Sequence, residues 1–217
     1  VKGADQWQHA VQSYLASVTF ADHCLGLVLD ALASSDYADN TIIALFSDHG
    51  FHLGEKERWA KRSLWEDGTR VPIIVSAPGH KAVQTTNRPA ELLDVFPTLL
   101  ELAGLPKDEN QEGQSLVPLM KDPKKEWNHP AITSFGLGNY SVRSTRYRFI
   151  QYFDGSRELY DLSQDPHEWK NLATDPKNKS IIAEHAAHLP KKEHPILPGG
   201  STGHNAYGAA NAKIKKD

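Results

Sequence analysis

Cysteine is nearly absent from this chain of 217 residues, which contains only Cys24. A single cysteine excludes an internal disulfide and leaves the redox compartment undetermined. Because Cys24 lies in a stretch of helical periodicity, we expect it to pack there as a small apolar side chain. Long hydrophobic runs are lacking as well. The longest contain about five residues, far fewer than the roughly 20 that span a bilayer, so no membrane partner is expected.

An excess of positive charge is also lacking. The chain has 24 Lys+Arg and 27 Asp+Glu, giving a formal net charge of −3, so no nucleic-acid partner is expected. No charged-then-apolar leader begins the chain, and its first residue is Val1, so we expect it to start inside a longer gene product. With 39% hydrophobic and 24% charged residues, the composition suits a soluble globular protein of one or two domains.

Apolar periodicity divides the first half of the chain into alternating helices and strands. In residues 4–34 apolar side chains recur at three- and four-residue steps, which predicts a helix. The short apolar runs at 41–46 and 71–76 predict buried strands, and the pattern at 91–103 predicts a second helix. This alternation is typical of an α/β fold, and we assign it to a domain over residues 1–106.

The pattern changes after Pro106. A polar connection follows, and the chain then predicts strands at 140–144, 146–153 and 157–161 and a helix at 179–188. Asp154-Gly155 between the last two strands is a hairpin signal. Residues 107–190 are therefore expected to form a small α+β subdomain. The segment 191–217, rich in Pro, Gly, Asn and Lys, is expected to be a loop-rich tail.

Candidate metal ligands follow directly after the strand predicted at 41–46. Open α/β sheets bind ligands beyond the carboxyl ends of their strands, and Asp48 and His49 stand there. A carboxylate oxygen and an imidazole nitrogen both suit a divalent cation. Gly50 and Gly54 would let the backbone fold tightly around a ligand. The alternative is that Asp48 caps the following turn and His49 is an ordinary polar residue.

Two further side chains in this loop are candidate contacts for an anion. Lys61 lies at the far end of the loop, and an ammonium group is a point charge suited to an anionic oxygen, although most lysines are simply solvated. His52 faces either the same cavity or solvent. Glu66 and Arg70 have the i,i+4 spacing of a structural ion pair.

The stretch "SDHGFHLGEKERWAKRSLWEDGTRVPIIVSAPG" resembles the sulfatase family, in particular iduronate-2-sulfatase-like and bacterial carbohydrate sulfatases. Asp-His-Gly, Gly-Glu, Trp-x-Lys and Thr-Arg-Val-Pro occur in the same order. Three further segments are similar as well, namely "YLASVTFADHCLGLVLDAL", "LLDVFPTLLELAGLP" and "SVRSTRYRFIQYFDGSRELYDLSQDPHEWKNLA". The resemblance covers roughly residues 7–190.

This resemblance implies an alkaline-phosphatase-like α/β fold whose catalytic domain would include residues 1–106 as its C-terminal part, followed by a small antiparallel sheet with one helix. Asp48 and His49 align with two ligands of a divalent cation, commonly calcium, with Mn²⁺ or Zn²⁺ as alternatives. Lys61 aligns with a sulfate-contacting lysine and is the predicted catalytic residue; Lys61 and His52 are the predicted substrate contacts. The family relation implies a periplasmic, secreted or lysosomal location, which the residues themselves do not fix.

Three family features are not matched. The nucleophile of the family is a formylglycine made from a Cys/Ser-x-Pro/Ala-x-Arg motif, whereas Cys24 is followed by Leu-Gly-Leu. An early Asp-Asp pair of metal ligands is lacking, and Lys56 stands where relatives often have histidine. The nucleophile and the remaining ligands are therefore expected in an N-terminal half, and this chain alone is expected to be inactive.

The predicted function is metal-assisted hydrolysis of a sulfuric ester on a sulfated carbohydrate. Two alternatives remain. The first is a phosphodiesterase or phosphonate hydrolase of the same superfamily, which His49 keeps open because Mn²⁺ and Zn²⁺ accept imidazole readily. The second is a truncated, non-catalytic module that binds an anionic glycan. The exact substrate is not fixed by the sequence.

Overall fold

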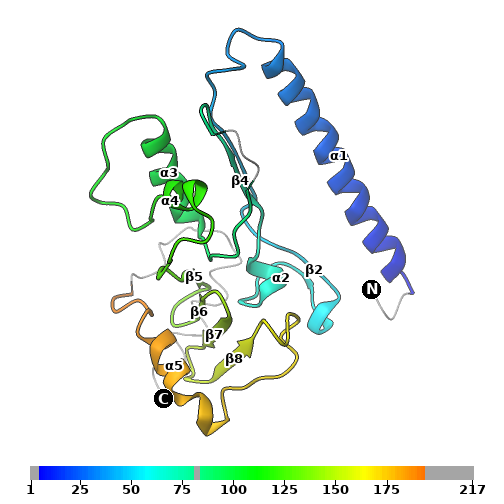
Figure 1. Cartoon of the computed structure of the whole chain (residues 1–217). Helices are drawn as coiled ribbons and strands as arrows, with labels where there is room; N and C mark the ends of the chain where they lie inside the picture. Colours follow the sequence, from blue (N-terminus) through cyan, green and yellow to red (C-terminus); the bar gives the residue numbers. More distant parts are fainter. Residues whose placement is uncertain (1–4, 81–83, 194–217) are drawn as a thin grey trace. The chain divides into compact units, whose positions relative to one another are not determined.

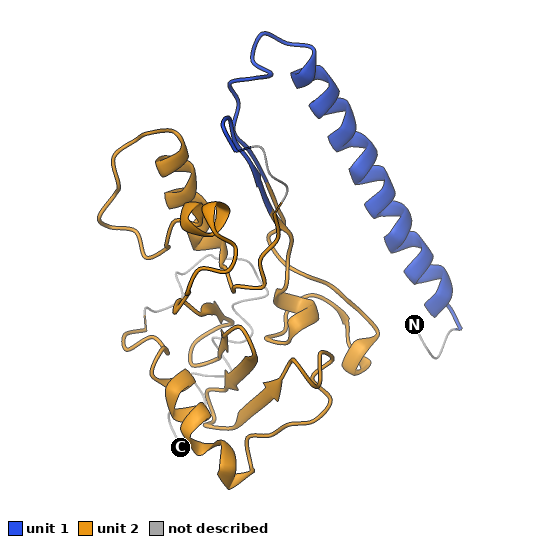
Figure 2. Cartoon of the chain, in the orientation of Figure 1, with its two compact units in different colours: residues 1–44, 74–81 blue, residues 45–73, 82–217 orange. Residues whose placement is uncertain are grey.

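The computed structural model describes residues 5–80 and 84–193. The chain divides into two compact units, residues 1–44 with 74–81 and residues 45–73 with 82–217 (Figure 2). The elements are labelled in Figure 1. Most of the loop-rich tail predicted at 191–217 lies outside the described residues.

The long helix α1 (Trp7–Ala33) confirms the helix predicted at 4–34. None of its residues is buried, and large apolar side chains along it are exposed, among them Leu15, Val18, Phe20, Leu27 and Val28. Cys24 is exposed as well. The expectation that Cys24 packs as a small apolar side chain is therefore wrong for this chain, because the helix that carries it has no buried residue.

Length and composition alone would let α1 cross a membrane. Counting uninterrupted apolar runs misses this helix, because single polar residues interrupt its apolar stretches without lowering its mean hydropathy much. The core helix of a soluble protein passes the same test, so the composition of α1 assigns it to neither environment.

The strands β1 (Ile43–Phe46) and β4 (Ile73–Ser76) pair in a two-stranded sheet. Both predicted strands are thereby confirmed. Their predicted burial is not, since Phe46 is 50% exposed and Ile74 is 57% exposed.

The charged segment after β1 forms a compact series of short elements. These are β2 (His52–Leu53), η2 (Glu55–Glu57), β3 (Trp59–Ala60) and the one-turn helix α2 (Glu66–Thr69). Strands β2 and β3 pair antiparallel, with His52 opposite Ala60 and Leu53 opposite Trp59. Arg70 and Glu66 form the predicted i,i+4 ion pair at 4.0 Å.

The helix predicted at 91–103 is confirmed, although its first turn is a 3₁₀-helix. The elements here are η3 (Leu92–Asp94), α3 (Val95–Leu102) and the short α4 (Val117–Lys121). Leu116, Leu119 and Trp127 form a small core beside α4, and Ile73 packs against it.

A four-stranded antiparallel sheet occupies the C-terminal part of the chain, in the order β5-β6-β7-β8. Its strands are β5 (Ala131–Ser134), β6 (Tyr140–Arg143), β7 (Tyr147–Gln151) and β8 (Arg157–Asp161), followed by η4 (Pro176–Asn178) and α5 (Lys179–Ala186). Gly155 turns the β7–β8 hairpin with a φ of 83°, a conformation that favours glycine. The predicted small sheet with one helix is therefore confirmed.

Alternation along the strands gives this sheet two covered faces. Phe149 and Leu159 point to the face covered by Ile182 of α5. Ile150 and Tyr160, their neighbours along the strands, point to the other face and pack against Leu64. The C-terminal sheet is thus the surface on which the segment after Lys61 is fixed.

The buried side chain of Arg148, 2% exposed, strengthens this second contact. Its Nη1 donates to the backbone oxygen of Leu64 at 3.1 Å and to Ser141 Oγ at 2.6 Å. Its Nη2 donates to Glu66, and its Nε lies 2.7 Å from Glu168 Oε1 as an ion pair. The backbone N–H of Glu66 donates to Glu168 Oε2 at 2.9 Å. One arginine thus holds a buried carboxylate, a partly buried carboxylate and a backbone carbonyl.

Burial by itself would raise the pKa of Glu66, but Arg148 and Arg143 lower it overall. A carboxyl group whose folded-state pKa is lowered stabilises the fold above its unfolded-state pKa. That contribution is lost as the pH falls through the folded-state value.

Replacing Arg148 by leucine should lower the free energy of unfolding by about 3–5 kcal/mol at pH 7, because the buried Glu168 loses its counter-charge and Glu66 keeps only Arg143 and Arg70. Urea denaturation of the variant and the parent protein measures this. The matched control is Arg146→Leu: Arg146 is 57% exposed and pairs with Asp161, so its loss should cost about 1 kcal/mol or less. The difference between parent and Arg148→Leu should shrink below about pH 4.5, where Glu66 becomes protonated in the unfolded state. Equal losses in both variants would contradict the role of Arg148.

Candidate metal and anion site

Three of the four predicted site residues lie together beyond the end of β1. Lys61 Nζ is 2.8 Å from His49 Nε2, and the same ring nitrogen is 3.6 Å from Asp48 Oδ2. The side chain of Asp48 is 81% exposed and that of His49 33% exposed. A carboxylate, an imidazole and an ammonium group therefore stand in a row that a ligand can reach.

The hydrogen bonds of His49 identify its protonated nitrogen. A lysine ammonium can only donate, so Nε2 of His49 accepts from Lys61 and the ring proton is on Nδ1. Nδ1 donates to the backbone oxygen of Gly50 at 2.8 Å. A bond from the second ring nitrogen to a backbone carbonyl is typical of histidines that bind metal ions, because it fixes the ring and the tautomer.

The position of this row depends on Gly50. Its N–H donates to the backbone oxygen of Gly68 at 3.1 Å, which places the turn against α2. A Cβ atom at Gly50 would lie 2.1 Å from the backbone oxygen of Asp67. Only glycine permits such a close approach of two backbones.

Asp48 and His49 together fit part of a cation site. They supply one oxygen and one nitrogen, whereas divalent cations take at least four ligands, so these residues would be a subset of the shell. Nε2 of His49 has one lone pair, which Lys61 uses. A cation at Nε2 therefore requires the Lys61 ammonium group to turn away toward another acceptor.

Backbone strain is concentrated in the segment around Lys61. Four residues other than glycine have positive φ there, Lys56 (52°), Glu57 (57°), Ala60 (82°) and Arg62 (61°). Such conformations cost on the order of 1–3 kcal/mol each and cluster at functional sites. Lys61 stands between two of these strained residues, so its position is imposed by the surrounding structure.

Lys56 does not join the row of Asp48, His49 and Lys61. Its ammonium group lies over the rings of Tyr160, Trp65 and Trp169, at 4.6, 4.8 and 5.9 Å from their centroids. It donates to the backbone oxygen of Glu168 and, at 3.4 Å, to Tyr160 Oη. The residue that departs from the family pattern thus links the loop to the C-terminal part of the chain.

His52 is fully buried, with an exposed fraction of 0%. Its Nε2 lies 2.6 Å from Ser63 Oγ, and its ring meets Trp65 edge-on at a centroid distance of 6.2 Å. Burial lowers the pKa of His52, against the opposing charge of Asp67, so the ring is held in its neutral form. A substrate contact by His52 stays a prediction, and its side chain is enclosed by the chain itself.

Sequence reasoning missed a second cluster of titratable groups. Nε2 of His129 lies 3.4 Å from both Glu91 Oε1 and Asp94 Oδ1. Asp94 is fully buried and accepts backbone bonds from Glu91 and Gln114, while Glu91 accepts one from Ile132. Burial raises the pKa of Glu91. These bonds connect η3 and the residue before it to β5, so the cluster has a structural role. No local pattern relates His129 to residues 35 and 38 positions earlier.

The chain matches two family models. The Sulfatase family model matches residues 2–105, and the model of the N-sulphoglucosamine sulphohydrolase C-terminal family matches residues 54–194. The chain belongs to the sulfatase family.

Two curated relatives illustrate the relation. A sulfatase of Formosa agariphila is 46% identical over 186 residues, covering 86% of this chain and 37% of the relative. A Δ4,5-hexuronate-2-O-sulfatase of Bacteroides thetaiotaomicron is 32% identical over 201 residues, covering 85% and 41%. The chain therefore spans about two fifths of the length of these relatives.

Solved structures of sulfatases confirm the predicted alkaline-phosphatase-like fold. A structure described as a 2-O GAG sulfatase has a TM-score of 0.77 at 27% identity, covering 97% of this chain and 45% of that one. A structure in complex with D-glucosamine-2-N,6-O-disulfate has a TM-score of 0.72 at 27% identity, covering 84% and 40%. The phosphonate monoester hydrolase of Agrobacterium radiobacter has a TM-score of 0.66 at 26% identity, covering 76% and 37%.

Replacing Lys56 by methionine should lower the free energy of unfolding by about 1–3 kcal/mol, because the ammonium group loses its aromatic neighbours and a charge-assisted hydrogen bond. Chemical denaturation followed by tryptophan fluorescence measures the loss. The matched control is Lys61→Met, which should change stability by about 0.5 kcal/mol or less because Lys61 is an exposed residue of the row. A Lys56→Met variant as stable as the parent would show that the ring contacts contribute nothing.

Proposed function

We propose that this chain is the C-terminal part of a sulfatase that removes sulfate from a sulfated carbohydrate. The proposal rests on the row formed by Asp48, His49 and Lys61, because it places two possible metal ligands next to an ammonium group that can contact an anion. Relatives that act on sulfated sugars, a hexuronate sulfatase and the enzyme bound to a glucosamine disulfate, support the substrate class. In this proposal residues 1–106 belong to the catalytic domain and residues 107–190 form the subdomain that supports it.

Sulfatases are in general metal-dependent, and we assign Asp48 and His49 to the metal. Asp48 would supply an anionic oxygen and His49 its Nε2, with the ring oriented by Gly50. We propose calcium, with Mn²⁺ or Zn²⁺ as alternatives. When bound, the cation supplies positive charge that stabilises the sulfate oxygens in the transition state.

Lys61 is the proposed contact to the transferring group. The backbone of Lys61 is held between two strained residues, Ala60 and Arg62. Its flexible side chain can rotate so that the ammonium group leaves His49 and contacts a sulfate oxygen. There it stabilises the charge that develops as the ester bond breaks. We assign this contact to Lys61 rather than to the fully buried His52. The nucleophile, a formylglycine in this proposal, is expected in a part of the protein outside this chain.

A phosphonate or phosphate diester hydrolase is the second candidate. It is favoured by His49, whose nitrogen suits Mn²⁺ or Zn²⁺ better than calcium, and by the likeness to the phosphonate monoester hydrolase. Comparing turnover of an aryl sulfate and an aryl phosphonate by the full-length protein separates the two. If the protein turns over neither substrate but still binds an anionic glycan, the result would favour a non-catalytic module.

Asp48→Ala in the full-length protein should lower the bound divalent metal and abolish turnover, because the carboxylate is the one anionic oxygen donor of the row. Metal content after dialysis, measured by mass spectrometry, tests this separately from activity. Asp39→Ala is a control at an exposed carboxylate outside the row. Unchanged metal stoichiometry in Asp48→Ala would remove this residue from the metal site.

Lys61→Ala should lower kcat/KM by a factor on the order of 10² to 10³, the effect of removing one electrostatic stabiliser of a transition state. Because the contact strengthens as charge develops, most of the loss should be in kcat. Lys61→Arg should restore the rate only in part, since a planar guanidinium differs in shape from an ammonium group. A folded Lys61→Ala variant with a near-parental rate would mean that Lys61 is an ordinary solvated lysine.

A further inference from the structure

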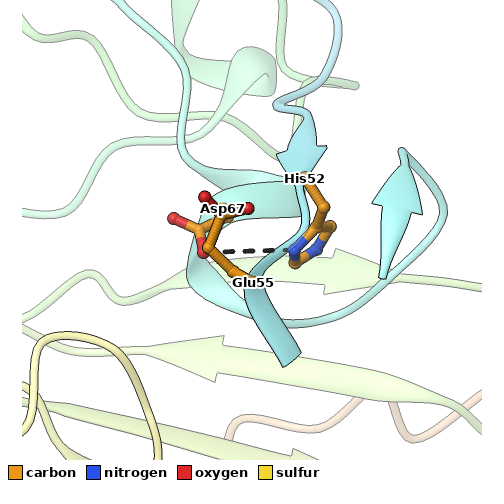
Figure 3. Close-up of side chains that lie close together, drawn as sticks. All are labelled: His52, Glu55 and Asp67. Carbon is orange, nitrogen blue, oxygen red and sulfur yellow. Dashed lines mark ion pairs between the residues drawn. The ribbon is translucent and has the colours of Figure 1, made fainter. Parts of the chain in front are cut away.

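Nδ1 of His52 is a buried polar atom without a hydrogen-bond partner. The whole His52 side chain is inaccessible, so water at the surface does not reach the ring. An unpaired buried group of this kind costs about 1–3 kcal/mol. The nitrogen faces two carboxylates, those of Asp67 and Glu55 (Figure 3).

Neither tautomer of His52 satisfies this nitrogen. If Nδ1 carries the proton, the nearest carboxylate oxygen, Asp67 Oδ2, is 4.0 Å away, too far for a hydrogen bond. If Nε2 carries the proton, it donates to Ser63 Oγ at 2.6 Å, and the lone pair of Nδ1 then faces Asp67 and Glu55. In that state three electron-rich groups, one from each residue, have ligand atoms within 4.8 Å of one another.

The two cations near this cluster both have backbone partners. Lys56 donates to the backbone of Glu168, and Arg58 donates from Nη2 to the backbone of Arg62, while its buried Nε has no partner. Glu55 keeps one carboxylate oxygen on the N–H of Leu53 at 2.6 Å. The arrangement therefore has ligand atoms and a fixed ring.

From this geometry we propose that His52, Glu55 and Asp67 bind a transition-metal dication of the Zn²⁺ or Mn²⁺ class. One imidazole nitrogen with two carboxylate oxygens suits these ions, and water would complete the shell. Two ligand atoms, each about 2.1 Å from a tetrahedral ion, lie about 3.4 Å apart, so the 4.0 Å between His52 Nδ1 and Asp67 Oδ2 has to shorten when the ion binds, which a turn of the half-exposed Asp67 side chain allows.

Two features of the surrounding chain support a built site. Ser63 supplies the hydrogen bond to the second ring nitrogen that metal-binding histidines generally have. A Cβ atom at Gly68 would lie 2.2 Å from Ser63 Oγ and 3.1 Å from His52 Nε2, so glycine keeps room for this pair. The side chain of Asp67 is 43% exposed, which gives an ion a route from solvent.

This site differs from the row at Asp48 in its ligands, and an ion here would brace the loop rather than contact the sulfate. It would link β2 and η2 to α2, the elements on either side of Lys61. The inference therefore stands or falls independently of the sulfatase reaction.

Binding of Co²⁺, a spectroscopic substitute for Zn²⁺, tests the proposal in the full-length protein. Titration followed by visible absorption, with the row at Asp48 first saturated with Ca²⁺, should show one bound Co²⁺ ion whose affinity falls at least about tenfold in Asp67→Asn and in Glu55→Gln. Ser63→Ala should weaken it by about 10–100-fold, the usual effect of losing the bond that orients a metal-binding ring. Asp67 is the decisive position, because its half-exposed side chain can be changed without opening the buried ring of His52.

Two controls separate this ion from others. Asp48→Asn should leave the Co²⁺ spectrum and affinity unchanged, whatever it does to turnover. Glu57→Gln, a change in the same loop outside the three ligands, should also leave them unchanged. Co²⁺ affinity in Asp67→Asn equal to that of the parent, or loss of the ion in Asp48→Asn alone, would overturn the proposal.

Discussion

The contact between Arg148 and the segment 64–66 is the constraint on which the candidate site depends. A buried arginine needs charged partners, and here Glu66 and Glu168 supply them while the carbonyl of Leu64 takes a further donor. Breaking such a network leaves a buried charge uncompensated, which is why it resists separation. Lys61 lies three residues before Leu64, so the sheet that carries Arg148 determines where the loop ends.

A second cation, Lys56, fixes the other side of the loop. Its ammonium group lies over the rings of Trp65, which directly precedes α2, and of Tyr160 in β8. It also donates to the backbone of Glu168, whose carboxylate pairs with Arg148. The strained backbone at Ala60 and Arg62 is therefore held between two anchored ends. Strain persists only where surrounding contacts over-determine it, and these two anchors provide such contacts. The small sheet thus contributes to the site without supplying a residue to it.

Local patterns were sufficient for elements whose cause is local. The helical period of α1, the hairpin signal at Asp154-Gly155 and the apolar runs of β1 and β4 all predicted the observed elements. Asp48, His49 and Lys61 were found because strand ends bind ligands and because their order resembles a family. Arg148 and Lys56 could not be assigned roles in this way, since the partners that tie them to the other part of the chain lie 82 to 112 residues away in sequence and only the tertiary fold brings them together. The burial expected for Cys24 failed for a related reason: periodicity identifies an apolar face but not what covers it.

The division of the chain into two units explains why Asp48, His49 and Lys61 have fixed mutual distances although the chain supplies only part of a metal shell. Asp48, His49 and Lys61 all belong to the unit that also contains the C-terminal sheet and its two packed faces. Their mutual distances follow from contacts inside that unit, through Gly50 against α2 and Leu64 against β7. The exposed apolar side chains of α1 belong to the other unit. The described residues are therefore sufficient to position Asp48, His49 and Lys61. The remaining ligands of the metal ion are assigned, in the proposed function, to other parts of the protein.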